Sequence, residues 1–232
     1  MRRQALDAVL RARAGKQSIA VVTRLADGAQ ALVRPDGIEG DLALEAAQLE
    51  QVRRQLTGGH TGMVGEGAHQ LFVRTYVPPP RLLIVGAVHV TQALAPMAVL
   101  AGFEVIVIDP RRAFGSEERF PGVTMTDEWP DDALRRIGID AHTAVVTLTH
   151  DPKIDDPTLV AALRSDAFYV GALGSPRTHA KRVARLTEKG LGEALPRVHA
   201  PVGLNLGGRA PAEIAVSILA QIVQVRHRGV AS

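Results

Sequence analysis

The first residues that could do chemistry lie in a turn after an apolar run. Residues 82–85 read Leu-Leu-Ile-Val and lead into Gly86, Val88 and His89. Asp109 ends a second apolar run about twenty residues on, where a dinucleotide-binding βαβ unit has the acidic residue that binds ribose. Val88 stands where that unit has its second glycine, which lets the backbone approach pyrophosphate. The pattern predicts the topology of such a unit but disfavours tight binding of NAD(P).

The segment Asp-Pro-Arg-Arg that begins at Asp109 has two interpretations. The carboxylate could accept hydrogen bonds from a ribose while Arg111 or Arg112 contacts a phosphate. Alternatively, the carboxylate caps a turn and both arginines are solvated. The residues leave both interpretations open. In either case, the helix expected after Gly86 offers free backbone N–H groups and a positive dipole end to an anion.

His150 and Asp151 follow the apolar run 144–148. The carboxyl edge of an open parallel sheet is where α/β folds bind ligands, and both residues are expected there. His150 could exchange a proton near neutral pH or donate to a phosphate or pterin oxygen, which makes it the candidate catalytic residue. The structural alternative is a turn at Asp151-Pro152 with His150 as a loop residue. The position at the sheet edge favours function.

A second glycine-bearing turn contains Gly171, Gly174, Ser175 and Arg177. Ser175 as a helix N-cap and Pro176 at the first helical position already account for the turn by local capping. The two glycines could also let the backbone approach a phosphate, with Arg177 supplying charge-assisted hydrogen bonds. Both interpretations stay open.

A third such turn, with Gly207, Gly208 and Arg209, opens the last expected helix. Its structural alternative is a flexible loop in which Glu213 interacts favourably with the helix dipole. Three glycine-bearing turns that each enter a helix are more than chain connection requires. Their convergence predicts a crevice lined by helix N-termini that binds an anionic, phosphate-bearing ligand.

These turns are positioned by alternating apolar runs and amphipathic segments in residues 81–232. Apolar runs that are separated by helices predict a Rossmann-like, mostly parallel sheet covered on both faces. A small α+β domain is expected over residues 1–77, with the three prolines of residues 78–80 as the linker. The expected strands are 19–23, 31–33, 71–73, 82–85, 105–108, 144–148 and 168–170, and the expected helices include 42–56, 131–137, 156–163 and one containing 214–225.

The amino-acid composition argues against several classes of function. Lys and Arg number 27 against 24 acidic residues, and aromatic residues are 3%, so neither charge nor stacking indicates a nucleic-acid partner. The absence of cysteine excludes disulfides and thiolate chemistry in this chain. The histidines lack ligand spacing, so no metal site is expected. No apolar run suits a signal peptide or a membrane span, which predicts a soluble cytoplasmic protein without membrane association.

Several motifs, in order from Arg81 to about Val225, resemble the XdhC/CoxI family. They occupy residues 81–90, 107–111, 118–121, 149–153, 169–175, 177–179 and 207–215. The resemblance implies an accessory protein that binds molybdenum cofactor and assists its sulfuration or insertion into a xanthine-dehydrogenase-type molybdenum hydroxylase. It also implies that hydroxylase as a partner, allows a cysteine desulfurase as a second one, and is compatible with a homodimer.

The first domain departs from the family pattern. Residues 24–28 and 39–45 stand where family members commonly carry a Gly-Ser-Ser-Pro-Arg-like stretch and a Gly-Gly-Cys segment. Without cysteine, any role that needs a thiolate in this chain is excluded. The alternatives are an NAD(P)-dependent oxidoreductase with His150 as acid and base, which Val88 disfavours, and a non-catalytic partner-binding protein. A cofactor chaperone is favoured over a catalyst.

Overall fold

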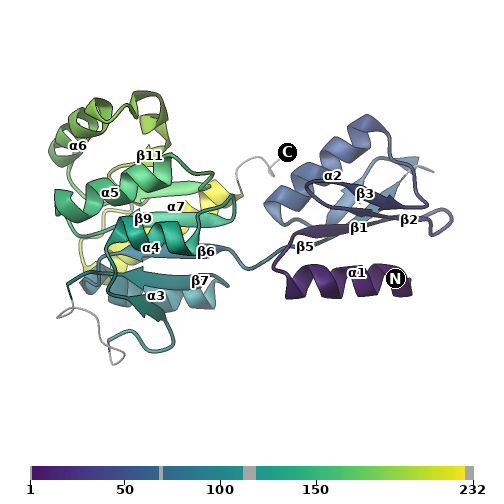
Figure 1. Ribbon diagram of the computed structural model, residues 1–232, viewed down its shortest axis with the longest axis horizontal. Helices are drawn as coiled ribbons and strands as arrows, with labels where there is room; N and C mark the ends of the chain where they lie inside the picture. The colour runs from purple at the N-terminus through teal and green to yellow at the C-terminus, as the bar shows by residue number, and fades with distance from the viewer. Residues whose placement is uncertain (1, 68–69, 112–118, 228–232) are drawn as a thin grey trace. The chain divides into compact units, whose positions relative to one another are not determined.

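A computed structural model describes residues 2–67, 70–111 and 119–227. The chain divides into two compact units, Met1–Pro78 and Pro79–Ser232 (Figure 1). The division falls within the run of three prolines, which fix φ and lack N–H donors, so neither a helix nor a central strand continues through it.

The first unit contains an antiparallel sheet in the order β3-β2-β1-β5-β4. Its strands are β1 (Ile19–Arg24), β2 (Gln30–Val33), β3 (Ile38–Gly40), β4 (Gly62–Val64) and β5 (Leu71–Tyr76). Because successive side chains of a strand point to opposite faces, Ala20 and Val22 of β1 pack with helix α2 (Ala46–Gly58). Ile19 and Val21 pack with helix α1 (Arg3–Ala14).

Two features of this unit differ from the sequence-based expectation. Helix α2 was expected from Leu42, but it begins at Ala46, because the backbone N–H of Glu45 donates to the Gln48 side chain at 3.1 Å and caps the helix there. Leu42 is buried in the core without being helical. The three-residue strands β3 and β4 were not expected, because such short segments carry no alternation to recognise.

The second unit is built on a parallel sheet in the order β11-β10-β9-β6-β7-β8. Its strands are β6 (Arg81–Val85), β7 (Glu104–Ile108), β8 (Thr124–Thr126), β9 (Thr143–Thr147), β10 (Tyr169–Ala172) and β11 (Val198–His199). All five neighbouring pairs are parallel. This is the strand order of a Rossmann fold, with its switch point between β6 and β9. The predicted fold class is confirmed.

Helices cover both faces of this sheet (Figure 1). Leu82 and Ile84 of β6 pack on the face covered by α3 (His89–Leu100) and α7 (Pro211–Arg226), and Leu83 and Val85 pack on the other. The second face is covered by α4 (Pro130–Ile137), α5 (Pro152–Leu163), α6 (Pro176–Glu188) and the 3₁₀ helix η2 (Gly192–Arg197). Strands buried on both faces explain the uninterrupted apolar runs of the sequence.

Helix α5 begins four residues earlier than expected. The side chain of Asp151 accepts a hydrogen bond from the Lys153 backbone N–H at 2.9 Å and caps the helix, with Pro152 at the first helical position. The segment Asp151-Pro152, for which a turn was the structural alternative, is therefore a helix start. In the described parts of the chain, no helix is long and apolar enough to cross a membrane.

Candidate functional site

The carboxyl ends of the parallel strands meet at one edge of the second unit. The turn after β6 contains Gly86, the end of β7 leads to Asp109, and the turn after β9 contains His150. The turn after β10 leads through Gly174 into α6. Side chains far apart in the sequence are thus gathered where open α/β folds bind ligands.

The Asp109 carboxylate is only 3% exposed and is held by four donors. The Ala87 N–H and Arg111 Nη2 donate to Oδ2 at 2.7 and 2.8 Å. The Arg111 backbone N–H and Nε donate to Oδ1 at 3.0 and 2.9 Å. Burial raises the pKa of Asp109, but the hydrogen bonds from Arg111 and Ala87 outweigh it, so the pKa lies below its ordinary value of 3.8. Both oxygens are engaged, which favours turn capping over ribose binding, although Arg111 is paired with Asp109 and is not solvated as the capping interpretation expected.

Gly86 brings the turn after β6 into contact with the turn after β9. Its φ is +113°, and a Cβ there would lie 2.7 Å from Cγ2 of Thr149. Val88 is the residue before α3 and packs against the core, while His89, the first residue of that helix, is exposed. Arg119 reaches the same turn and donates to the Ala87 carbonyl at 3.2 Å. Arg112 and the first residue of the motif at 118–121 lie outside the described residues.

A buried carboxylate, Asp155, lies in the first turn of α5, shortly after His150 in the chain. Asp155 is 1% exposed, and its Oδ1 accepts hydrogen bonds from the hydroxyls of Thr147 and Thr149, the latter at 2.6 Å. Its Oδ2 faces Nη2 of Arg182 at 3.6 Å and has no hydrogen-bond partner among the described residues. His150 itself is exposed and has a positive φ of +63°. Such a backbone conformation is uncommon for a residue other than glycine and often marks a functional turn.

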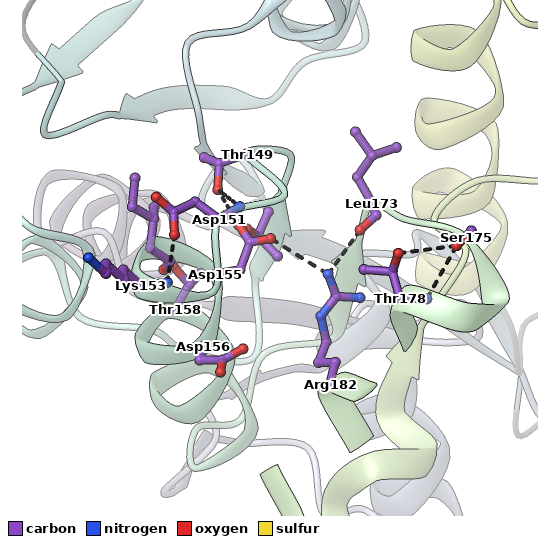
Figure 2. Close-up of polar contacts among 12 residues, drawn as sticks. Thr149, Asp151, Lys153, Asp155, Asp156, Thr158, Leu173, Ser175, Thr178 and Arg182 are labelled. Carbon is purple, nitrogen blue, oxygen red and sulfur yellow. Dashed lines mark hydrogen bonds and ion pairs between the residues drawn. The ribbon is translucent and has the colours of Figure 1, made fainter. Parts of the chain in front are cut away.

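Arg182 of α6 is the buried cation opposite Asp155. It is 2% exposed, and its Nη2 donates to the Leu173 carbonyl at 2.9 Å. Figure 2 shows the guanidinium between that carbonyl and Asp155. Its Nε and Nη1 are buried and have no hydrogen-bond partner in the described parts of the chain. Burial lowers the pKa of Arg182, and the carboxylates of Asp155 and Asp156 oppose that effect. A buried charge with unmade hydrogen bonds is costly, which makes this a site that a ligand can complete.

The two charged side chains border a pocket of about 240 Å³ between the start of α5 and helix α6. It is lined by His150, Pro152, Asp155, Arg177, Thr178, Lys181, Arg182 and Arg185. Arg185 is held by Asp156 through two bonds of 2.6 and 2.9 Å. Arg177 and Lys181 are exposed and make no ion pair with any described residue. We call this the α5–α6 pocket.

The α5–α6 pocket contains two of the residues predicted from sequence, His150 and Arg177. Asp151 beside it caps α5. Gly174, with φ +142°, and Ser175 shape the entry to α6, where Ser175 Oγ accepts the Thr178 N–H at 3.2 Å. The expected capping by Ser175 and Pro176 is therefore observed, and Arg177 lines the pocket, where its contact with a ligand stays a prediction.

The remaining predicted residues lie outside the lining of this pocket. A Cβ on Gly171 would lie 2.6 Å from Val202 Cγ2, so this glycine serves packing. Gly207, Gly208 and Arg209 are exposed before α7. The Glu213 side chain accepts the backbone N–H groups of Arg209 and Ala210 at 2.8 and 2.9 Å, which occupies amides that an anion would need.

Sequence reasoning missed Asp155, Lys181, Arg182 and Arg185. One signal was available, because Arg177, Lys181 and Arg185 recur every four residues and thus share one face of α6. The burial of Arg182 had no such signal, since arginine is normally exposed. In the described ranges, the structure also groups no three His, Asp or Glu side chains that could hold a metal ion.

Comparison with known proteins identifies the family of the second unit. A family model for the XdhC Rossmann domain matches residues 82–222, which include every strand from β6 to β11 apart from the first residue of β6. The chain belongs to the XdhC family. This membership accounts for the order of motifs from Arg81 onward that the sequence shows.

Relatives of this XdhC family member are curated under different names. The uncharacterized protein YqeB of Escherichia coli K12 is 32% identical over 221 residues, which are 86% of this chain and 40% of the relative. A probable xanthine dehydrogenase subunit of Bacillus subtilis 168 is 32% identical over 184 residues, 78% of this chain and 53% of the relative. The molybdenum cofactor insertion chaperone PaoD of Escherichia coli K12 is 34% identical over 150 residues, 64% of this chain and 41% of the relative.

A solved structure extends the likeness to both units. The crystal structure of a xanthine dehydrogenase from Bacillus halodurans matches 99% of this chain and 66% of its own, with a TM-score of 0.72 and 26% identity. The chain spans 40 to 53% of the length of the curated relatives it matches.

Proposed function

We propose that this chain binds molybdenum cofactor as cargo and assists its insertion into a xanthine-dehydrogenase-type molybdenum hydroxylase. The names of two relatives, a molybdenum cofactor insertion chaperone and a probable xanthine dehydrogenase subunit, support this proposal. The observation that carries it is the α5–α6 pocket, where Arg177, Lys181 and the buried Arg182 meet at the carboxyl edge of the sheet.

The residues of the pocket fit an anionic cargo. Molybdenum cofactor is a phosphorylated pterin whose dithiolene sulfurs hold the metal. The unmade hydrogen bonds of Arg182 suit oxyanion acceptors, and guanidinium groups bind such acceptors with charge-assisted hydrogen bonds. His150, exposed at the mouth of the pocket, can donate a hydrogen bond or a proton to the bound cargo. In this proposal the chain acts as a chaperone, and His150 positions cargo.

The sulfur chemistry belongs to a partner in this proposal. Sulfuration requires a sulfur carrier, and this chain contains no cysteine. A cysteine desulfurase would therefore bring the sulfur to cofactor that is held on this chain. The target hydroxylase would then receive the sulfurated cofactor, with this chain acting in the cytoplasm as a monomer or homodimer.

The direct test of this function is retention of released cofactor. The purified chain is mixed anaerobically with cofactor released from a molybdenum hydroxylase and separated by gel filtration. Molybdenum is measured in each fraction, and pterin fluorescence is measured after the fractions have been oxidised. Co-elution with the protein peak is the expected result. Elution of all cofactor at the small-molecule volume would refute the function.

The same purified chain can be used to test the alternative function, an NAD(P)-dependent oxidoreductase. Asp109 already binds Ala87 and Arg111, and Val88 packs where backbone would approach pyrophosphate, so NADH should not stabilise the chain. Protection from thermal unfolding by NADH or NADPH, without protection by the cofactor, would favour the oxidoreductase instead.

A further inference from the structure

We infer that the α5–α6 pocket takes the phosphate monoester end of the cargo, leaving the pterin ring and the metal outside it. This inference rests on the proposed function and specifies which part of the cargo the pocket recognises. Four properties of the pocket support it: its size, its lining, its charge and its incomplete hydrogen bonds.

The volume of the α5–α6 pocket limits the size of the group that can bind in it. The pocket measures about 240 Å³, below the roughly 300–1,000 Å³ of pockets that enclose whole drug-sized ligands. A phosphate group with its first carbon fits such a volume, whereas a tricyclic pterin with its metal does not. The pocket is therefore suited to one end of the cargo.

The lining carries charged and polar side chains and no aromatic ring apart from the His150 imidazole at its mouth. A pterin ring is a flat aromatic system, which proteins usually hold by stacking and by apolar contact. The carbon surface of the lining comes chiefly from the Pro152 ring and the stems of Arg and Lys side chains, and not from an aromatic side chain on which such a ring could stack. The lining thus favours a compact anion over a ring.

The charge of the lining matches a phosphate monoester. Arg185 is neutralised by Asp156, which leaves Arg177, Lys181 and Arg182 against the single carboxylate of Asp155. A phosphate monoester carries close to two negative charges at neutral pH, because its second pKa is about 6. Two uncompensated positive charges suit that group better than they suit a single carboxylate.

The unmade hydrogen bonds of Arg182 and Asp155 also fit a phosphate group. Nε and Nη1 of Arg182 lack acceptors, and Oδ2 of Asp155 lacks a donor, although all three atoms are buried beside the pocket. Phosphate oxygens accept from the guanidinium, and a water held between the phosphate and Asp155 donates to the carboxylate. One phosphate group and one bridging water can therefore satisfy both Arg182 and Asp155.

The first test uses inorganic phosphate on the full chain, with binding measured by isothermal titration calorimetry at constant ionic strength. Lys181→Ala removes one cation of the pocket from an exposed helical position that tolerates alanine. We expect this change to weaken phosphate binding about tenfold, as for loss of one charge-assisted contact. Arg164→Ala is the control, because Arg164 is an exposed cation in a separate groove between α4 and α5. Equal affinity in wild type, Lys181→Ala and Arg164→Ala would overturn the inference.

The second test separates the inference from the proposed function. Released cofactor is offered to the chain with its phosphate intact or after removal by a phosphatase, and retention is compared. Loss of retention after dephosphorylation, together with competition by inorganic phosphate, supports the inference. Equal retention of both forms would overturn it while leaving the chaperone function standing. Phosphate binding that depends on Lys181, without retention of either form, would overturn the function and leave a phosphate site.

Discussion

Charged side chains are nearly fully buried at a few positions of the described chain, and these positions belong to the second unit. They are Asp109, Asp155, Asp156 and Arg182, each at most 5% exposed. Removing charges from water costs several kcal/mol for each ion, by a rough estimate, unless partners compensate. Asp109 and Asp156 have such partners in Arg111 and Arg185, while Arg182 and Asp155 are only partly satisfied. Incomplete compensation at one place indicates a binding site there.

Asp109 gives a prediction about pH. Its pKa is lowered in the folded state, so its stabilisation is fully present above the ordinary carboxyl pKa of 3.8 and is lost as pH falls through the folded pKa. Asp109→Asn should therefore lower the free energy of unfolding at neutral pH by about 1–3 kcal/mol, and by less in acid. Urea unfolding of both proteins at neutral and acidic pH measures the difference. Asp166→Asn, at an exposed carboxyl, is the control, and a difference that stays constant with pH would contradict the prediction.

The sequence predicted some residues of the site and not others. His150 and Arg177 were found because residues just after apolar runs lie at the carboxyl edge of a parallel sheet. The role of Asp109 stayed open, because the direction of the Ala87 N–H depends on the fold of the turn. Lys181 and Arg182 are adjacent on α6, yet the first is exposed and the second buried. Only the packing of α6 against α5 separates them.

The turns after β6 and β9 pack closely against each other at Gly86. An alanine there would adopt an unfavourable φ and would also contact Thr149. We expect Gly86→Ala to lower the free energy of unfolding by about 2–4 kcal/mol. Gly102→Ala is the matched control, because Gly102 has φ +86° but no atom within 4 Å of the added Cβ. Equal losses in the two variants would show that the contact with Thr149 contributes nothing.

Glu213 is predicted to stabilise the start of α7. Its carboxylate accepts two backbone N–H groups, and these bonds lower its pKa. Glu213→Ala should lower the free energy of unfolding modestly, as for loss of a helix cap. The affinity for cofactor should not change, since this turn lies outside the α5–α6 pocket. Thermal unfolding and cofactor retention of the same variant check both statements. A large loss of affinity for cofactor would show that the turn before α7 belongs to the binding site.

The elements themselves were predicted unevenly. The long strands β6, β7 and β9 were recognised because burial on both faces leaves uninterrupted Val, Ile and Leu. The two-residue strand β11 and three-residue strand β8 exist through tertiary pairing alone, which no short pattern reveals. The start of α5 was misplaced because Asp-Pro is as typical of a turn as of a capped helix.

For the whole molecule, the central claim is that cargo binds through the α5–α6 pocket and not through the general basic charge of the chain. The formal net charge is only +3, so general attraction for anions should be weak. Binding that depends on the position of two cations, and not on their number, would distinguish the two explanations.

The measurement that tests this most directly is the anaerobic dissociation constant for released cofactor in two double variants. Arg177→Ala with Lys181→Ala removes two cations of the pocket, and Arg135→Ala with Arg164→Ala removes two from the groove between α4 and α5. We predict that the first pair weakens binding by about 100-fold and the second leaves it unchanged. Equal weakening by the two pairs, or none by either, would contradict the account.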